Sequence, residues 1–357
     1  MEPKLRFTKM QGLGNDYLYV FGAVPENVED LCVRLCDRHF GVGADGMIFI
    51  DASTAADFSM SIFNSDGSEA LRKYQSGLLD FVELSGEAVE QMKTSPDFRP
   101  VDSGFLYYIT FNFDDPHFAN KNLRRAFAMA VDREQIITEM ADGSAAAYAA
   151  IPRGFAFSQS GEDFTPKGVE YPELTSYNPA RARELLAAAY RGLGVNSLDL
   201  ELLTADGEAQ VIASQSIKRQ AEAVLPGVRI TVKAVPKSER RKIMSSGAFQ
   251  FGLNNWGPDY ADPMTYLAMW VTGNDNNQGN YFNPAYNALI ASCTDGELCT
   301  KINERWSALK QAEGMIMEDA VIMPIYQKCN ANLIKSNVRG IAFHAVAINR
   351  IYKSTTK

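Results

Sequence analysis

The side chains best suited to ligand chemistry lie in one segment, "NNWGPDYADPMTYLAMW" at residues 254–270. It follows directly on the strand-like stretch "FQFGLNNW" at residues 249–256. Open α/β sheets bind ligands beyond the carboxyl ends of their strands, where carboxylate, amide and aromatic side chains would contact a ligand. The segment is therefore either a ligand site or a loop beneath which Trp256 and Tyr260 merely pack. The residue types alone favour neither interpretation.

Strands and helices alternate ahead of this segment. Strands are predicted at "FLYYITFN" (105–112), which is aromatic and β-branched, and at "LDLELLTA" (198–205) and "VRITVKAV" (228–235), which alternate apolar and polar residues. Helices are expected over 207–224 and after the last of these strands. With the strand that ends at Trp256, this order predicts an α/β lobe with βαβ crossovers.

Two further helices are expected in the same region. "NKNLRRAFAMAVDREQIITEMADG" (120–143) has helical periodicity and is expected to form one helix, with Arg124 and Arg125 on a solvated face. "YNPARARELLAAAY" (177–190) has an Asn-Pro start, which predicts a helix capped by Asn178. The residues expected to face the core are Leu123, Phe127, Ala130, Val131, Ile136, Met140, Ala182, Leu185, Leu186 and Ala189.

The first seventy residues form a separate pattern. Strands are expected at "KLRFTKM" and "YLYVFG", which the glycine-rich turn "QGLGND" separates, and again at "GMIFID" and "DFSMSIFN". Between the two pairs, "VEDLCVRLCDRHFG" (28–41) has apolar residues at helical spacing. The turn is not a dinucleotide-binding fingerprint, because no helix follows it.

Length, charge and composition exclude several classes of function. The 357 residues allow two or three domains, and the 46% of hydrophobic and 22% of charged residues are ordinary for a globular protein. A net charge of −8 argues against nucleic acid as a partner, since phosphate binding needs a basic face. The first 22 residues lack a signal-peptide pattern, so the chain as written is expected to stay in the cytoplasm.

Cysteine and histidine usage predicts neither a metal nor a cofactor. The chain has five cysteines and no export signal, which favours free thiols. Cys32 and Cys36 are expected to be buried small hydrophobes rather than a redox pair, and Cys293 and Cys299 would bridge only under oxidation. The histidines, His39, His117 and His344, have no metal-ligand spacing.

Three N-terminal segments resemble diaminopimelate epimerase, in order and at the family's spacing: "FTKMQGLGNDYLYV", "RHFGVGADGMIFI" and "FSMSIFNSDGSEA". That family uses no cofactor and inverts an amino-acid α-carbon with two cysteines. The resemblance implies that Asn15 and Asn64 hydrogen-bond the substrate. The sequence departs from the family at 71–77, where "LRKYQSG" replaces the element that carries the first catalytic cysteine. We therefore expect no catalytic residue and no racemisation.

The region from about 68 to 353 resembles the C-terminal part of family 5 extracellular solute-binding proteins, the peptide receptors of ABC importers. The matching segments are "YQSGLLDFV", "FNFDDPHFANKNLRRAFAMAVDREQI", "YNPARARELLAAAY", "NNWGPDYADPMTYL", "GNYFNPAYNALI" and "MEDAVIMPIYQKCNANLIKSNVRGI". The resemblance implies that Asp259 pairs with a peptide's N-terminal ammonium and that Trp256 walls a side-chain pocket. The other residues that it implies as peptide contacts are Tyr260, Asn254, Asn255, Asn280 and Tyr281.

These patterns together predict a mixed α/β (α+β) protein. A partial, β-rich epimerase-like lobe is expected at 1–70 and a periplasmic-binding-protein type II-like lobe at 71–357, with 71–118 and 330–357 in its hinge or first lobe. The strand at 58–64 is expected either to leave an open edge or to pair with the sheet that begins near "LLDFVEL".

Three functional hypotheses follow from the two resemblances. The first is a truncated solute-binding protein that binds short peptides weakly, because members of the family are longer and the absent front half would supply the opposite wall of the cleft. An ABC transporter permease would be its partner if it were exported. The second is a diaminopimelate epimerase, which the missing cysteine element makes inactive. The third is a fusion without function, joined at "SEA".

Overall fold

The computed structural model describes residues 5–12, 15–22, 24–25, 28–37, 41–44, 46–51, 59–64, 68–84, 87–166, 171–346 and 350–357. The chain divides into two compact units. The first contains Met1–Arg99, Ala331–Arg339 and Lys357, and the second contains Pro100–Asn330 and Gly340–Thr356. Each unit is described by itself.

The first unit begins with a sheet whose strands follow the order β1-β2-β3-β4. They are β1 (Thr8–Gly12), β2 (Asn15–Phe21), β3 (Gly46–Asp51) and β4 (Ser59–Asn64). β2 and β3 are parallel, and the two outer pairs are antiparallel. The strand expected at 58–64 thus pairs with β3 and leaves its other edge open among the described residues. The first of the two alternatives is correct.

Helix α1 (Val28–Cys36) packs on one face of this sheet. Its Cys32 and Cys36 are buried beside Leu18 and Met47, and their Sγ atoms lie 3.7 Å apart, a hydrogen-bonding distance and not a disulfide. All five cysteines are free thiols, as expected. The helical spacing of apolar residues within 28–41 thus corresponds to α1, which covers one face of the sheet.

The rest of the first unit forms a second apolar cluster. It contains α2 (Ser68–Gln75), β5 (Phe81–Leu84) and α3 (Glu87–Met92). β5 pairs with Ala331–Ile334, the last residues of the long strand β11 (Ile322–Ile334). Tyr74 on α2 is buried there, and its hydroxyl donates to Asp97 Oδ2 at 2.7 Å.

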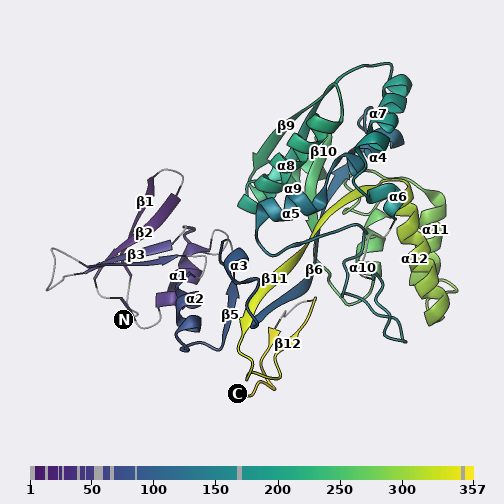
Figure 1. Ribbon diagram of the computed structural model, residues 1–357. Helices are drawn as coiled ribbons and strands as arrows, with labels where there is room; N and C mark the ends of the chain where they lie inside the picture. Colours follow the sequence, from purple (N-terminus) through teal and green to yellow (C-terminus); the bar gives the residue numbers. More distant parts are fainter. Residues whose placement is uncertain are drawn as a thin grey trace. The chain divides into compact units, whose positions relative to one another are not determined.

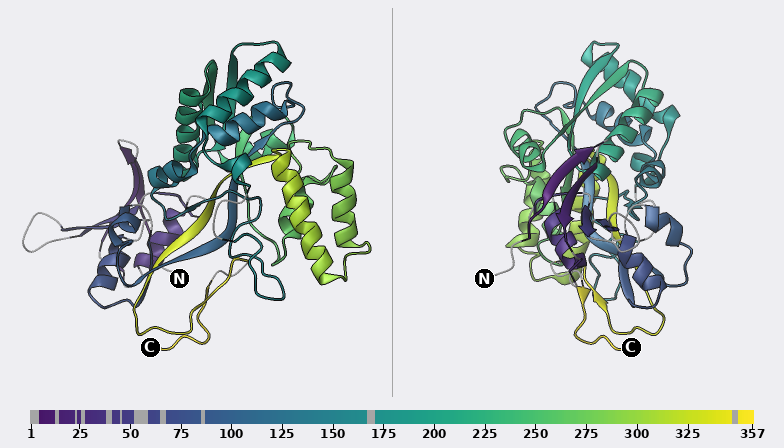
Figure 2. Two further views of the ribbon diagram at one scale, coloured as in Figure 1. Left: turned by 45° about the vertical axis from the view of Figure 1, so that its right-hand side comes forward. Right: turned by 90° about the vertical axis from the view of Figure 1, so that its left-hand side faces the viewer.

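The second unit is built on strands in the order β11-β6-β10-β8-β9, of which Figure 1 labels β6, β9, β10 and β11. The short β7 pairs with β11. The strands not yet bounded are β6 (Phe98–Phe111), β7 (Ala145–Ala146), β8 (Leu198–Ala205), β9 (Val228–Val235) and β10 (Phe251–Trp256). Figure 2 shows β11, in yellow, beside β6, in blue. β8 is parallel to both β9 and β10, which confirms the predicted βαβ crossovers.

Alternate residues of β6 divide the second unit into two apolar layers. Ile109 and Phe111 face one core with α4 (Lys121–Ala130), α5 (Arg133–Met140), α7 (Pro179–Leu193) and α8 (Glu208–Val224). Leu106 and Tyr108 face the other core, around Trp270. The elements of that layer are α10 (Met264–Leu267), the 3-10 helix Ala268–Trp270, α11 (Pro284–Thr294) and α12 (Ile302–Glu318).

The remaining elements are short, apart from one crossover helix. They are α6 (Pro172–Thr175), α9 (Lys237–Ser245), β12 (Ala342–Phe343) and β13 (Arg350–Ile351). α9 connects β9 to β10 and packs its Met244 against Leu203 of β8. Within the described residues, no helix is long and apolar enough to cross a membrane.

The single helix expected over 120–143 is wrong, because the segment forms α4 and α5. Val131 between them is extended, with φ −118° and ψ 120°. Asp132 then caps α5, and its side chain accepts from Glu134 N at 3.0 Å. An aspartate cap competes with helix continuation. The ten residues expected to face the core are nevertheless all buried, and Asn178 caps α7 as predicted.

The solvated position expected for Arg124 is also wrong. Arg124 is 3% exposed. Its guanidinium makes four hydrogen bonds to the carbonyl oxygens of Phe118, Ala119, Asp319 and Ala320, at 2.6 to 3.1 Å. Arg125 fits the expectation better, since it is only partly buried and pairs with the exposed Glu318. The hydrophobic periodicity of the helix does not show that Arg124 is buried, because its partners are carbonyl groups that include those of a segment far along the chain.

Candidate functional site

The segment 254–270 begins where β10 extends beyond its pairing with β8. β10 pairs with β8 only as far as Gly252, opposite Leu203, but it pairs with β6 up to Trp256, opposite Leu106. The last residues of β10 and the following loop therefore lie beyond the paired part of β8, at the carboxyl ends of the parallel strands. Such a position is where open α/β sheets bind ligands.

Two polar side chains hold the loop in place. Thr265 is buried, and its Oγ1 accepts from Asp259 N at 3.1 Å and from Trp256 Nε1 at 3.5 Å. Asp262 accepts two hydrogen bonds from Arg305, at 2.7 and 3.0 Å, and one from Met264 N at 2.8 Å. The bond to Asp262 raises the pKa of Arg305. The loop is thus fixed at its start and at its end.

Asp259 and Tyr260 are exposed polar residues of the loop. The Asp259 side chain makes no hydrogen bond or ion pair within the described part of the chain, and only its backbone N–H is bonded. Tyr260 is 47% exposed, and partial burial together with Asp262 and Asp259 raises the pKa of its hydroxyl. One aspartate of the loop therefore serves the structure, whereas the other presents a free carboxylate to solvent.

Trp256 and Asn255 lie at the same end of β10 as the loop, and the side chain of Asn254 beside them is already hydrogen-bonded. Trp256 is half-buried and its ring packs at the edge of the second core. Asn255 lies opposite Tyr107 on β6. The side-chain amide of Asn255 has no hydrogen-bond partner among the described residues. Asn254 donates to Gln278 Oε1 at 3.1 Å and accepts from Asn255 N at 2.9 Å. Asn254 therefore acts first as a structural residue.

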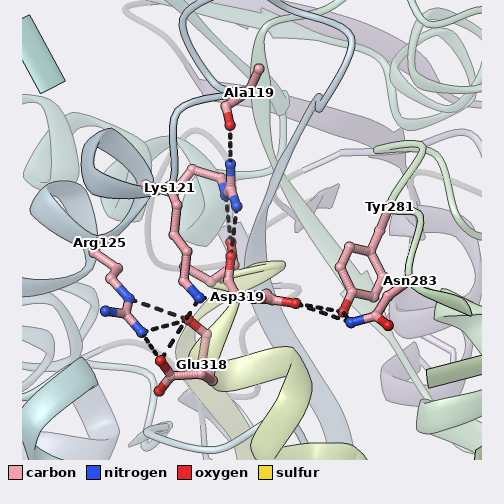
Figure 3. A network of polar contacts seen from close by, with 9 residues as sticks. Ala119, Lys121, Arg125, Tyr281, Asn283, Glu318 and Asp319 are labelled. Atoms are coloured by element: carbon pink, nitrogen blue, oxygen red, sulfur yellow. Dashed lines mark hydrogen bonds and ion pairs between the residues drawn. The ribbon is translucent and has the colours of Figure 1, made fainter. Parts of the chain in front are cut away.

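Tyr281 and Asn280 are engaged within the protein. Tyr281 is buried, and its hydroxyl donates to Asp319 Oδ2 at 2.7 Å (Figure 3). Asn280 has a left-handed backbone with φ 55°, and its amide donates to Asp114 Oδ2 at 2.5 Å. Of the residues expected to contact a peptide, Asp259, Tyr260 and Asn255 thus make no side-chain hydrogen bond within the described residues, and Trp256 is half-buried.

Asp319 is the centre of the network that holds Tyr281 (Figure 3). It also accepts from Lys121 Nζ at 2.8 Å and from Asn283 Nδ2 at 3.3 Å. Burial alone would raise the pKa of Asp319, but these hydrogen bonds outweigh it and leave the pKa below its usual value. The network joins the start of α4, the end of α12 and the segment before α11.

The two asparagines expected in an epimerase-like site lie at one end of the N-terminal sheet. Asn15 is the first residue of β2 and Asn64 is the last residue of β4. Gly46 pairs with both Tyr17 and Asn64, which places Asn15 and Asn64 at the same end. Their side chains, and also His39, lie outside the described residues. The nearby thiols of Cys32 and Cys36 are buried in the core.

A cavity of about 630 Å³ lies elsewhere in the second unit. Its wall includes Asp102, Tyr148, Arg153 and Cys329, and Arg153 makes two hydrogen bonds to Asp102, at 2.9 and 3.1 Å. None of the residues expected to bind a ligand lines it. The described residues contain no group of three or more potential metal ligands.

The sequence did not point to Thr265 and Arg305, although both position the loop. Thr265 lies inside the segment, but nothing in its neighbourhood distinguishes it from a surface threonine. Arg305 is 43 residues away from Asp262 in the sequence. A local sequence pattern cannot reveal a pair so far apart. The positive charge of Arg305 was the only property in the sequence that could have suggested a carboxylate partner.

Two family profiles match this chain. The profile described as "Bacterial extracellular solute-binding proteins, family 5 Middle" matches residues 55–278, more than half of the chain. The profile of diaminopimelate epimerase matches residues 7–72. The two matches overlap at the segment where the sequence shows a join.

Individual relatives also match two different parts of the chain. A dipeptide-binding protein of Lactococcus lactis is 29% identical over 305 residues, which cover 81% of this chain and 54% of the relative. This chain therefore spans about half the length of that protein. A diaminopimelate epimerase of Caldanaerobacter subterraneus is 53% identical over 66 residues, which cover 18% of this chain and 24% of the enzyme.

A solved structure supports the expected fold. The structure described as Listeria monocytogenes OppA bound to peptide matches with a TM-score of 0.66 and 28% sequence identity. The match covers 84% of this chain and 58% of the Listeria protein. The mixed α/β architecture expected from the sequence, with a type II-like binding-protein lobe, is therefore confirmed.

Proposed function

Because the chain belongs to the family 5 bacterial extracellular solute-binding proteins, we propose that its second unit binds short peptides at the loop that follows β10. The observation that carries this proposal is the free carboxylate of Asp259 on a loop that Thr265 and Asp262 hold in place. A rigid loop with an unpaired, exposed carboxylate is suited to a cationic group of a ligand. The peptide seen in the Listeria relative supports the ligand class.

Asp259 accepts the N-terminal ammonium of the peptide in this proposal. An ammonium beside a carboxylate forms a charge-assisted hydrogen bond, which is stronger than a neutral one. The unpartnered amide of Asn255 is available to the peptide backbone, and the half-buried ring of Trp256 offers an apolar surface to the first side chain. The contacts of Asp259 and Asn255 do not depend on which amino acids the peptide carries, so the site is expected to accept many sequences.

We expect this chain to bind peptides weakly. Asp259 is exposed to water, and an ion pair between exposed groups contributes only about 0–1 kcal/mol. Tight small-molecule sites bury about 70–90% of the ligand surface, which an open loop does not provide. Delivery of peptide to an ABC transporter permease belongs to the proposal only for a chain that reaches the extracellular side, where the family is found.

Calorimetric titration with a mixed pool of tri- to pentapeptides tests this function. We expect dissociation constants well above micromolar, and we expect N-acetylated peptides to bind less tightly than free peptides because acetylation removes the ammonium. Asp259→Asn should abolish that difference. Asp295→Asn, the same charge change at the exposed end of α11, should preserve it.

The results that contradict the proposal are equally specific. Sub-micromolar affinity that Asp259→Asn removes would show that the site is strong and not weak. Equal binding of free and acetylated peptides would remove Asp259 from the site. The absence of binding by every peptide in the pool would refute peptide binding by this chain.

We propose no catalysis by the N-terminal region. The residues that match the epimerase end near Leu71, and "LRKYQSG" stands where the family carries its cysteine element. The thiols nearest to Asn15 in the sequence belong to Cys32 and Cys36, which are buried against the sheet. Proton abstraction from an α-carbon needs a positioned base and acid, and this region supplies neither.

A further inference from the structure

Two thiols lie next to each other in the core of the N-terminal sheet. Cys32 and Cys36 are four residues apart on α1, and their Sγ atoms are separated by 3.7 Å. Their side chains are 2% and 3% exposed. Within the described part of the chain, no other two cysteines have thiols in contact. The peptide-binding proposal gives these two side chains no role, so the pair can be considered by itself.

The geometry of the pair does not suit a disulfide. Side chains four residues apart on a helix have Cβ atoms about 5–6 Å apart, whereas a disulfide needs about 3.5–4.5 Å between them. The two sulfur atoms would also have to approach from 3.7 Å to about 2.0 Å. Closing that bond would distort α1, so direct oxidation is not the chemistry that this arrangement favours.

A metal ion between the two sulfur atoms needs no such movement. A bond from a metal ion to a cysteine thiolate is about 2.3 Å long, and two such bonds span 3.7 Å at an angle of roughly 110° at the metal. That angle is close to those of trigonal and tetrahedral coordination. The two thiols are therefore already separated as two ligands of one metal ion would be.

The neighbouring side chains determine which metal ion fits. Met47 on β3 is 0% exposed and belongs to the same buried cluster as Cys32 and Cys36. The described residues contain no group of three or more His, Cys, Asp or Glu side chains. Structural zinc sites need four such ligands, and calcium and magnesium need oxygen ligands. A set of thiolate and thioether sulfur selects a soft ion, Cu(I).

We propose that Cys32 and Cys36 bind one Cu(I) ion, with the thioether of Met47 as the third ligand. Binding is a ligand exchange without a change of oxidation state. Two S–H bonds break, two Cu–S bonds form, and two protons pass to solvent. Because protons are released, the affinity increases with pH. The ion would join α1 to β3 and stabilise the folded N-terminal sheet. This site does not depend on the proposed peptide function.

Anaerobic competition with bicinchoninate, which forms a coloured Cu(I) complex, tests the site. Copper is supplied as tetrakis(acetonitrile)copper(I), and every protein carries Cys299→Ser, because Cys299 is an exposed thiol that could bind Cu(I) by itself. We expect one equivalent of Cu(I) to be bound. Cys32→Ala should weaken binding by at least about 100-fold, since losing even an outer-shell partner costs about 10- to 100-fold. Cys293→Ala, at a buried cysteine of the second unit, should leave the affinity unchanged.

X-ray absorption of the copper-loaded protein tests the ligand set. We expect three sulfur neighbours in the Cys299→Ser protein and two after the additional change Met47→Leu, which nearly conserves volume. Two sulfur neighbours in both proteins would remove Met47 from the site.

The site itself is refuted if Cys32→Ala leaves the affinity unchanged or if bicinchoninate takes all the copper. If Cys32→Ala does not fold, the Cys299→Ser protein decides, because fewer than two sulfur neighbours in its spectrum would exclude the cysteine pair.

Discussion

The N-terminal sheet and the loop after β10 make an instructive comparison. The sheet belongs to the segment with the higher sequence identity to known proteins, whereas the loop lies in a region that matches its relatives less closely. Yet the epimerase-like segment ends before the element that would carry its catalytic thiol. The loop after β10, in contrast, has the exposed carboxylate of Asp259 and the two side chains, Thr265 and Asp262, that hold it in place. Sequence identity shows that a segment is related to a family. The activity of that family also requires every catalytic or binding group of its site.

The two regions also differ in how they are held together. The described core of the N-terminal sheet is one apolar cluster under α1, and the sheet exposes Met10 and Phe21 to solvent. The second unit has apolar layers on both faces of its sheet and buries three arginines among them. Buried polar groups fix a unique arrangement when their bonds are satisfied. The second region is therefore expected to respond more strongly to single substitutions.

The largest effect in this comparison concerns catalysis. With LL-diaminopimelate in D₂O, we expect no exchange of the α-proton above the buffer background. A missing proton-transfer group costs a factor of about 10² to 10⁴, and "LRKYQSG" stands where the family carries its first catalytic cysteine. Mass spectrometry of recovered substrate measures the exchange, with an active diaminopimelate epimerase as positive control. Exchange that disappears in Cys32→Ser or Cys36→Ser would show that the N-terminal sheet retains chemistry and would reverse the comparison.

The next effect concerns the stability of the second unit. Arg124→Ala removes a guanidinium that satisfies four carbonyl groups. We expect it to lower the free energy of unfolding by at least about 3 kcal/mol, because each buried acceptor left unpaired costs about 1–3 kcal/mol. Urea unfolding followed by tryptophan fluorescence reports on the second unit, which contains all three tryptophans.

Arg125→Ala is the matched control for that experiment. Arg125 pairs with Glu318, whose side chain is 60% exposed, so we expect a loss of no more than about 1 kcal/mol. Equal losses in the two variants would mean that the buried network adds nothing beyond a surface ion pair. The contrast between the two regions would then rest on apolar packing alone.

The sequence predicted much of the fold because hydrophobic periodicity and caps are local signals. The spacing of Leu185, Leu186 and Ala189 identified the inner face of α7, and Asn178 identified its first residue. The alternation in β8 and β9 predicted strands, and their order with the helices between them predicted the crossovers. These features depend on neighbours within a few residues, which a single sequence displays.

What the sequence could not predict depends on partners far along the chain. Arg124 donates to the carbonyl of Ala320, 196 residues away, and a backbone acceptor has no sequence signature. The break between α4 and α5 at Asp132 was missed because the apolar stripe continues through it. The candidate site shows the same limit, since nothing near Asp262 in the sequence indicates that Arg305 binds its carboxylate.

The smallest effect concerns Asp319 and its dependence on pH. Hydrogen bonds from Lys121, Tyr281 and Asn283 outweigh burial and hold the pKa of Asp319 below the value of an unfolded chain, about 3.9. A group with a lowered pKa stabilises the folded state above its unfolded pKa, and this contribution is lost as the pH falls through its folded pKa. We therefore expect Asp319→Asn to cost about 1 kcal/mol at pH 7, since the carboxylate is partly exposed.

The same variant should lose its disadvantage in acid. As the pH falls below the unfolded value of about 3.9, the advantage of the ionised Asp319 decreases, and it is lost once the pH has passed through the lower pKa of the folded state. The urea midpoints of the unmodified protein and the asparagine variant should therefore converge in acid. Asp295→Asn, the same charge change at an exposed site, controls for net charge. If the Asp319→Asn difference stayed constant from pH 7 to pH 3, the network would stabilise through its neutral hydrogen bonds. The second unit would then differ from the N-terminal sheet in geometry and not in charge.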